Sequence, residues 1–150
     1  HANSANQALD RIINFFPDER REQLLMDLSL NLRALISQRL IPREAGAGRI
    51  AAMEIMLNSP LIQDLIFKGE VTKIKEVMAR SNRMGMKTFD QALFELYEGG
   101  YVSYEDALRN ADSKNELRLK IKLDSKREQK NLDDEGALAI LDDEDKGRSL

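Results

Sequence analysis

The chain has 150 residues, a net charge of −3 at pH 7, and 42% hydrophobic and 33% charged residues, which suits one ordinary domain. It has no cysteine and one histidine, His1, so a disulfide framework and a thiolate metal site are excluded, and a histidine-based metal site or catalytic triad is nearly so. No apolar run reaches the ~20 residues of a membrane-spanning helix, and the first residues lack the features of a signal peptide. Because the chain opens without an initiator methionine, we expect it to be part of a longer protein.

The first part of the chain predicts two helices. Ser4 and Gln7 have the spacing of a capping box, in which each side chain satisfies a free backbone N–H at a helix start. Apolar residues at helical spacing follow until Pro17. A second helix is predicted from Asp18, with leucines at helical spacing as far as Leu35.

A β-hairpin is predicted next, and it is the only sheet that the sequence indicates. Residues 34–41 and 49–57 are short, apolar runs that are compatible with strands. The turn between them, residues 44–48, is too short to be a phosphate-binding loop.

Everything after the hairpin is predicted to be helical. Ser59 before Pro60 is a strong start signal, and a further helix is expected over residues 71–83. Three later helices are expected to begin after Thr88, Ser103 and Ser113. A basic turn is expected at residues 80–87, where two methionines flank a glycine. This pattern is typical of a helix C-cap with core methionines.

The charge is distributed unevenly near the end of the chain. Basic residues outnumber acidic ones seven to three between Lys114 and Lys130, and residues 133–145 hold seven acids and no base. We interpret this as a solvated helix followed by a disordered acidic tail, with domain bounds of 1–123 and 124–150 and a weak docking segment at 136–141. The alternative is a nucleic-acid binder, whose affinity would fall steeply with salt.

No catalytic motif is present in the sequence. The carboxylates stand mostly where helix starts or exposed faces place them, so dipole and capping roles explain them better than acid–base chemistry. The residues alone therefore indicate a helical interaction or assembly module. One such reading is a stand-alone adaptor whose helices, residues 59–123, bind a protein partner.

Long, ordered stretches of the chain resemble the type IV pilus retraction ATPases, the PilT/PilU family. The resemblance covers residue 1 to about Leu123 and is nearer to the PilU branch than to the PilT branch. It is carried by HANSANQALDRIINFFPDERR, LISQRLIP, AAMEIM, SPLIQDLI and GMKTFDQALFELYEGGYVSYEDALRNADSKNELRL.

The resemblance implies a fold and a function. Family members are hexameric motors that use ATP and magnesium to remove pilin subunits at the pilus base. This chain would be mostly α-helical with a short β-hairpin, as the C-terminal helical part of a RecA-like α/β ATPase domain. His1 would be the histidine of the His box, near the phosphates, whereas the Walker A lysine, the Asp box and the Walker B acid would precede it. We therefore expect neither a cofactor nor ATP hydrolysis in this chain alone.

The resemblance also implies partners and a location. The partners are sibling subunits of a homohexamer, a PilT-type motor and the pilus platform of the inner membrane. The protein would be cytoplasmic and peripheral at that membrane, with no nucleic-acid partner. Arg11 resembles an arginine of the wider secretion-ATPase superfamily, and no role is assigned to it.

One predicted helix matches the family motif AIRNLI, which is associated with retraction rather than with ATP turnover. Here the motif reads Leu61, Ile62, Gln63, Asp64, Leu65 and Ile66. Gln63 and Asp64 stand where PilT-type members have arginine and asparagine. We expect this motion-coupling helix to pack through Leu61 and Leu65 and to move as a rigid lever, although the same stripe is typical of a core helix.

Overall fold

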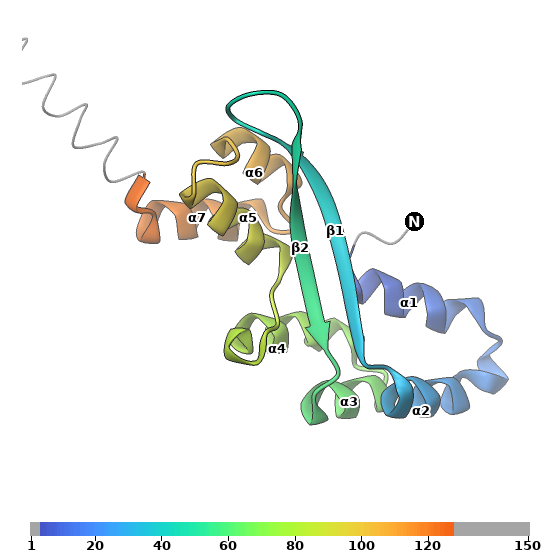
Figure 1. Ribbon diagram of the computed structural model, residues 1–150. Helices are drawn as coiled ribbons and strands as arrows, with labels where there is room; N and C mark the ends of the chain where they lie inside the picture. The colour runs from blue at the N-terminus through green and yellow to red at the C-terminus, as the bar shows by residue number, and fades with distance from the viewer. Residues whose placement is uncertain (1–3, 128–150) are drawn as a thin grey trace, which may run out of the picture.

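The computed structural model describes residues 4–127, in which a two-stranded hairpin carries helices at both of its ends (Figure 1). The elements, in chain order, are α1 (Ala5–Phe15), the 3₁₀ turn η1 (Asp18–Arg20), α2 (Arg21–Asn31), β1 (Ala34–Pro42), β2 (Arg49–Leu57), α3 (Pro60–Phe67), η2 (Val71–Lys73), α4 (Ile74–Arg80), η3 (Asn82–Met84), α5 (Phe89–Glu98), α6 (Tyr104–Asn110) and α7 (Lys114–Asp124). The predicted fold class, mostly α with a short β-hairpin, is confirmed.

The predicted helix starts are capped by the expected side chains. At each start a hydroxyl oxygen accepts a hydrogen bond from the backbone N–H three residues later, and the caps are Ser4, Ser59, Thr88, Ser103 and Ser113. At α5 the capping box is complete, because the Gln91 N–H donates to Thr88 Oγ1 at 3.3 Å and the Thr88 N–H donates to Gln91 Oε1 at 3.1 Å. Local sequence therefore fixes where these helices begin.

The capping box of α5 gives a measurable prediction. Thr88→Ala removes the hydroxyl that satisfies the Gln91 N–H, so it is expected to lower the free energy of unfolding by about 0.5–2 kcal/mol. Urea unfolding of the chain measures this loss. The exposed Thr72→Ala is the matched control and should change the free energy of unfolding by less than about 0.5 kcal/mol.

The second predicted helix is shorter than expected. It begins with the turn η1 and ends at Asn31, so the leucine stripe does not continue as a helix to Leu35, which lies in β1. The Asn58 side-chain amide explains the end, because its Nδ2 donates to the carbonyl oxygens of Ser29, at 3.0 Å, and of Leu32, at 2.7 Å. These carbonyls would otherwise lack partners at the helix C-terminus.

The helix predicted over residues 71–83 is divided into η2, α4 and η3. Two side chains satisfy carbonyls near the end of α4, because Ser81 Oγ donates to Val77 O at 2.7 Å and Gln91 Nε2 donates to Ala79 O at 2.9 Å. The segment then ends at Gly85, whose φ of +92° is the left-handed conformation predicted for a C-cap glycine.

The hairpin is antiparallel, and its register pairs all nine residues of β1 with β2, from Ala34 with Leu57 to Pro42 with Arg49. Side chains that are opposite each other share one face of such a pair. The inner face is buried at Ile41, Ala52, Glu54 and Met56. The outer face is apolar but open, with Ile36 64% and Leu40 54% exposed.

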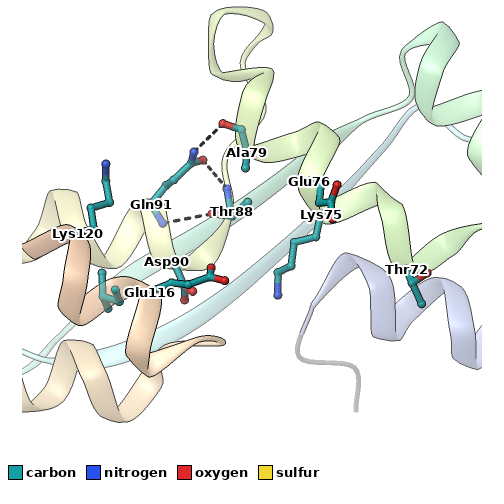
Figure 2. Close-up of a pocket in the computed structure, with 10 residues that line it drawn as sticks. Thr72, Lys75, Glu76, Ala79, Thr88, Asp90, Gln91, Glu116 and Lys120 are labelled. Atoms are coloured by element: carbon teal, nitrogen blue, oxygen red, sulfur yellow. Dashed lines mark hydrogen bonds between the residues drawn. The ribbon is translucent and has the colours of Figure 1, made fainter.

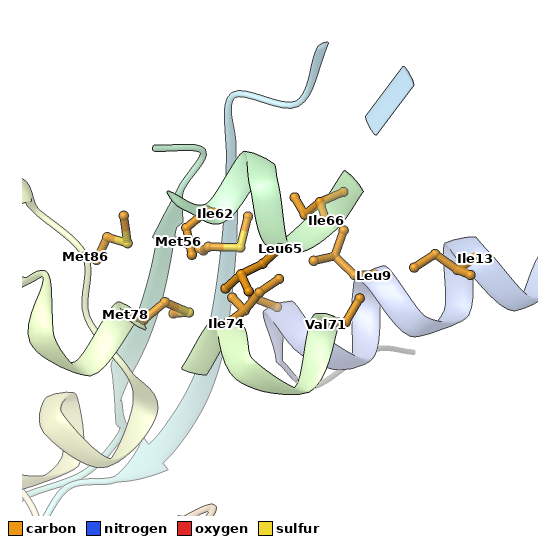
Figure 3. Close-up of a cluster of buried hydrophobic side chains, with 11 residues drawn as sticks. Leu9, Ile13, Met56, Ile62, Leu65, Ile66, Val71, Ile74, Met78 and Met86 are labelled. Atoms are coloured by element: carbon orange, nitrogen blue, oxygen red, sulfur yellow. The ribbon is translucent and has the colours of Figure 1, made fainter. Parts of the chain in front are cut away.

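Two hydrophobic cores lie at the two ends of the inner face of the hairpin. The base core joins β2 to α1, α3 and α4 (Figure 3), and its buried residues are Ala5, Leu9, Ile13, Met56, Ile62, Leu65, Ile66, Val71, Ile74, Met78 and Met86. The tip core joins the hairpin to α5, α6 and α7, and its buried residues are Ile41, Ala52, Phe89, Ala92, Leu93, Tyr97, Val102, Ala107, Leu117 and Ile121. The two cores share no buried residue, and polar side chains that reach from one end to the other help to join them.

Ordered contacts continue past the end of α7. Glu98 accepts hydrogen bonds from Ser125 Oγ at 2.7 Å and from the Lys126 N–H at 2.8 Å, and Arg127 contacts the carboxylate of Glu44. The first residues of the predicted tail are therefore packed against α5. Beyond Arg127 the predicted tail, including its apolar docking segment, lies outside the described residues.

Candidate functional site: helix α3 and an ion bridge between two cores

The helix that carries the retraction-motif resemblance, α3, is held in the base core by one face. Ile62 and Ile66 are fully buried and Leu65 is 7% exposed. Leu65 belongs to the same buried cluster as Leu9 of α1 and Ile74 of α4 (Figure 3). Because close-packed side chains transmit displacement rather than absorb it, a shift of α3 would be passed to α2 and α4, which pack against it.

The prediction that Leu61 packs inward is wrong. Leu61 is 55% exposed, and the inward residues are instead Ile62, Leu65 and Ile66. The N-cap at Ser59 sets the phase of the helix, and this phase places Leu61 on the outer face. The outer face also carries Asp64, which pairs with Lys68 at 2.7 Å. α3 therefore presents an apolar side chain and an ion pair to the surroundings.

An ion bridge joins the two ends of the molecule. Asp112, on the link between α6 and α7, binds Arg39 of β1 at 2.7 Å through one oxygen and Lys75 of α4 through the other. The Arg39 guanidinium also donates to Asn110 O at 2.5 Å and lies 3.9 Å above the ring of Phe89. The ion bridge, Arg39–Asp112–Lys75, thus connects α4, which packs in the base core, with the helices of the tip core.

The ion bridge perturbs the ionisation of Asp112. Burial alone raises the pKa of this carboxyl, but the hydrogen bonds from Lys75 and Arg39 outweigh burial and hold the pKa below its ordinary value of 3.8. A lowered carboxyl pKa contributes stability above pH 3.8 that is lost as the pH falls through the folded-state value.

The pH dependence of unfolding tests this contribution. The chain is expected to lose free energy of unfolding as the pH falls below 3.8, and Asp112→Asn should remove the part of that loss that belongs to Asp112. Urea titrations of both proteins at pH 6 and pH 3 measure the difference. An unchanged acid-side loss in Asp112→Asn would contradict this assignment.

A cleft of about 420 Å³ lies beside the ion bridge, between α4 and the helices α5 and α7. Figure 2 shows Lys75, Glu76 and Thr72 on one side of it and Asp90, Gln91, Glu116 and Lys120 on the other. Asp90 is engaged in holding the α6–α7 link, since its carboxylate accepts hydrogen bonds from the N–H groups of Asp112, at 2.7 Å, and Ser113, at 3.0 Å. The cleft marks the boundary between the two ends of the molecule.

A buried carboxylate, Glu54, lies on the inner face of the hairpin close to the ion bridge. Only 1% of Glu54 is exposed, and one of its oxygens accepts a hydrogen bond from the Ala5 N–H at 2.7 Å. Burial raises the pKa of this carboxyl above its ordinary value of 4.5, and the bond from Ala5 offsets this only in part. Lys75 and Asp112 are the charged groups that act on it.

The other residues that sequence reasoning singled out do not gather at this site. His1 lies outside the described residues, and Arg11 is exposed on α1. Within residues 4–127 no group of three or more His, Asp or Glu side chains could hold a metal ion. No helix in that range is long and apolar enough to cross a membrane.

Sequence reasoning missed the ion bridge and Glu54. The only available signal for Glu54 was its place in the alternation of β2, where it stands between the inward-facing Ala52 and Met56. No signal indicated that Arg39, Lys75 and Asp112 meet, because 36 to 73 residues separate them along the chain and their distance depends on how the two ends pack.

Comparison with known proteins places the chain among the pilus motors. No family model matches it. It is 54% identical to the type IV pilus ATPase PilU of Pseudomonas aeruginosa over 99% of this chain and 40% of that protein. It is 36% identical to the type IV pilus retraction ATPase PilT of the same organism over 74% of this chain and 32% of that protein. A twitching motility protein of Neisseria gonorrhoeae is 35% identical over 75% of this chain and 30% of that protein.

Solved structures agree with the sequence relatives. The crystal structure of the pilus retraction motor PilT with bound ADP superposes with a TM-score of 0.70 and 32% identity, over 79% of this chain and 32% of that one. The ATPase DotB of Legionella pneumophila shares the fold at a TM-score of 0.59 and 19% identity, over 71% of this chain and 29% of that one. The chain spans well under half of these relatives, which fits the predicted C-terminal part. The chain belongs to the type IV pilus ATPase family that includes PilU and PilT.

Proposed function

We propose that this chain is the C-terminal, motion-coupling part of a hexameric, ATP-driven motor that retracts type IV pili in twitching motility. The observation that carries the proposal is the 54% identity to PilU over 99% of the chain. The packing of α3 supports it further, because one face of this helix is fixed in the base core while the other is exposed. A helix held in this way can pass the motion of one subunit to a neighbour.

The full-length protein, on this proposal, binds ATP and magnesium through residues that this chain lacks. Phosphoryl transfer needs backbone amides around the phosphates, a lysine and a metal held by hydroxyl or carboxylate ligands. The sequence contains no G-x-x-x-x-G-K-[ST] motif. His1 would contribute to the nucleotide site only in the full-length protein, and the chain alone would bind no cofactor and hydrolyse no ATP.

The proposed partners are sibling subunits of a homohexamer, a PilT-type motor and the pilus platform of the inner membrane, at whose cytoplasmic side the protein would act. Large apolar side chains left open in the described part of the chain support contacts with further protein surface. Among them are Phe15, which is 87% exposed, and Leu30, Ile36 and Leu123, which are 60–64% exposed.

A complementation experiment tests the proposed function. A bacterium from which the whole reading frame has been deleted should lose twitching motility, and the full-length protein should restore it whereas residues 1–150 alone should not. Unchanged twitching in the deletion strain would contradict the proposal. Full restoration by the 150 residues would favour a stand-alone adaptor instead.

A further inference from the structure

We propose that Glu54 is a positioning residue, which fixes the first turn of α1 against the hairpin and so sets the location of the chain segment that leads into α1. In the proposed motor this segment carries the nucleotide-site histidine, so the inference rests on the proposed function. It assigns to the hairpin a part in ATP turnover, in addition to the part of α3 in passing on motion.

The contact joins two segments that are 49 residues apart in the sequence. Glu54 Oε1 accepts a hydrogen bond from the Ala5 N–H at 2.7 Å, and both residues are 1% exposed. Helix starts near a chain end usually fray. Here Ser4 and Ala5 are buried, and Leu9 one turn later is fully buried in the base core. The first turn of α1 is therefore as buried as the residues of the base core.

Capping of α1 alone does not explain a buried carboxylate at this position. Ser4 already supplies the local cap, because its Oγ accepts a hydrogen bond from the Gln7 N–H at 3.3 Å. What Glu54 adds is a link to a distant strand. A carboxylate at the positive end of a helix is electrostatically favourable, which compensates part of the cost of burying it.

The cost of burial indicates that Glu54 has a role beyond packing. Its neighbours on the inner face of β2 are Ala52 and Met56, and an apolar side chain would fit that pattern. Its second oxygen, Oε2, is buried and accepts no well-formed hydrogen bond in the described part of the chain, although the backbone N–H of Phe89 acts weakly on this carboxyl. A buried polar atom without a partner destabilises the fold, so Glu54 is a costly choice for a core position.

The link to ATP turnover follows from the order of residues along the chain. His1 is three residues before Ser4, and Ser4 is the cap of the helix start that Glu54 holds. A reacting group displaced by about 1 Å can lose about a hundredfold in rate. A loosened start of α1 should therefore lower the turnover number for ATP while leaving its KM nearly unchanged.

The first test measures the contact in this chain. Glu54→Met keeps the volume and removes the acceptor, whereas Glu54→Gln keeps a carbonyl oxygen that can accept from the Ala5 N–H. We expect amide hydrogen exchange in the first turn of α1 to become about tenfold faster in Glu54→Met and to change less than threefold in Glu54→Gln, following loss or retention of one hydrogen bond. Unchanged exchange in both variants would overturn the proposal.

The second test uses the full-length protein. Glu54→Met is expected to lower kcat for ATP at least about tenfold with KM within about twofold, and Glu54→Gln should restore most of the rate.

Glu98→Gln is the matched control for this second test. Glu98 also holds a distant backbone N–H, that of Lys126, but at the tip end of the molecule. The Glu98→Gln variant should leave kcat and KM for ATP unchanged. Loss of kcat in Glu98→Gln equal to that in Glu54→Met would overturn the proposal, as would an unchanged kcat in Glu54→Met. A wild-type protein without any ATP hydrolysis would instead reject the proposed function, and the inference with it.

Discussion

Leu65→Ala is expected to lower the free energy of unfolding by about 2–5 kcal/mol, whereas Leu61→Ala should change it by less than about 0.5 kcal/mol. Both residues lie in α3, but Leu65 is 7% exposed in the base core and Leu61 is 55% exposed. Removing three buried carbon atoms of Leu65 leaves a cavity between α1, α3 and α4, and nothing comparable happens at Leu61. Urea unfolding of the two variants measures the difference.

The same pair separates coupling from folding in the full-length protein. Leu61→Ala is expected to reduce twitching about tenfold or more while the ATPase rate stays within about twofold, because the outer face of α3 would meet a moving neighbour. Leu65→Ala should also lower twitching more than ATPase rate. Equal losses of both activities in Leu65→Ala would mean that Leu65 serves only the core.

An exposed leucine elsewhere is the control for Leu61. Leu119 on α7 is 57% exposed, so it matches Leu61 in chemistry and exposure but lies at the other end of the molecule. Leu119→Ala should leave twitching and ATPase rate unchanged. If it reduced twitching as much as Leu61→Ala does, the outer face of α3 would have no special role.

Asp112→Ala is expected to lower the free energy of unfolding by about 2 kcal/mol. Exposed ion pairs contribute about 0–1 kcal/mol to stability, and breaking a buried pair costs about 3–5 kcal/mol. The expected loss for the ion bridge is intermediate because its side chains are only partly buried. The side chains of Asp112 and Arg39 are 18% and 20% exposed, and that of Lys75 is 37% exposed. The variant leaves two cations close together at the boundary of the two cores.

Asp124→Ala provides the comparison for this loss. Asp124 pairs with Lys120 at 3.1 Å within one helix, and both side chains are more than 40% exposed. This variant should lose no more than about 0.5 kcal/mol. If Asp112→Ala lost as little as Asp124→Ala, the ion bridge would add nothing measurable to the joining of the two ends of the molecule.

Local signals were sufficient for most of the fold. Helix starts at Ser59, Thr88 and Ser103 were predicted because the physics that selects them lies within four residues, where a hydroxyl meets a backbone N–H. The hairpin was predicted with nearly the observed bounds because two apolar runs flank a glycine-containing turn. Helix ends were harder to predict, since the end of α2 is set by Asn58, which is 26 residues or more away from the carbonyls that it binds.

The candidate site was predictable only in part. The motif resemblance located α3, but the direction of Leu61 depends on the phase set by the cap at Ser59, and an apolar stripe on both sides of a helix leaves that phase open. The roles of Glu54 and Asp112 depend on contacts between residues 37 or more apart in the sequence. Such contacts follow from the packing of two cores on one hairpin, and no local pattern encodes that packing.

ATP hydrolysis by two proteins side by side tests the central claim, that this chain couples motion in a motor whose phosphate-binding residues lie elsewhere. The first protein is the product of the uninterrupted reading frame that contains these residues. The second is the 150-residue chain, with its His1→Ala variant as a control. We expect magnesium-dependent hydrolysis by the former and no rate above the blank by the latter. Hydrolysis by the 150 residues that His1→Ala abolishes, or an inactive full-length protein that lacks a Walker lysine, would contradict the claim.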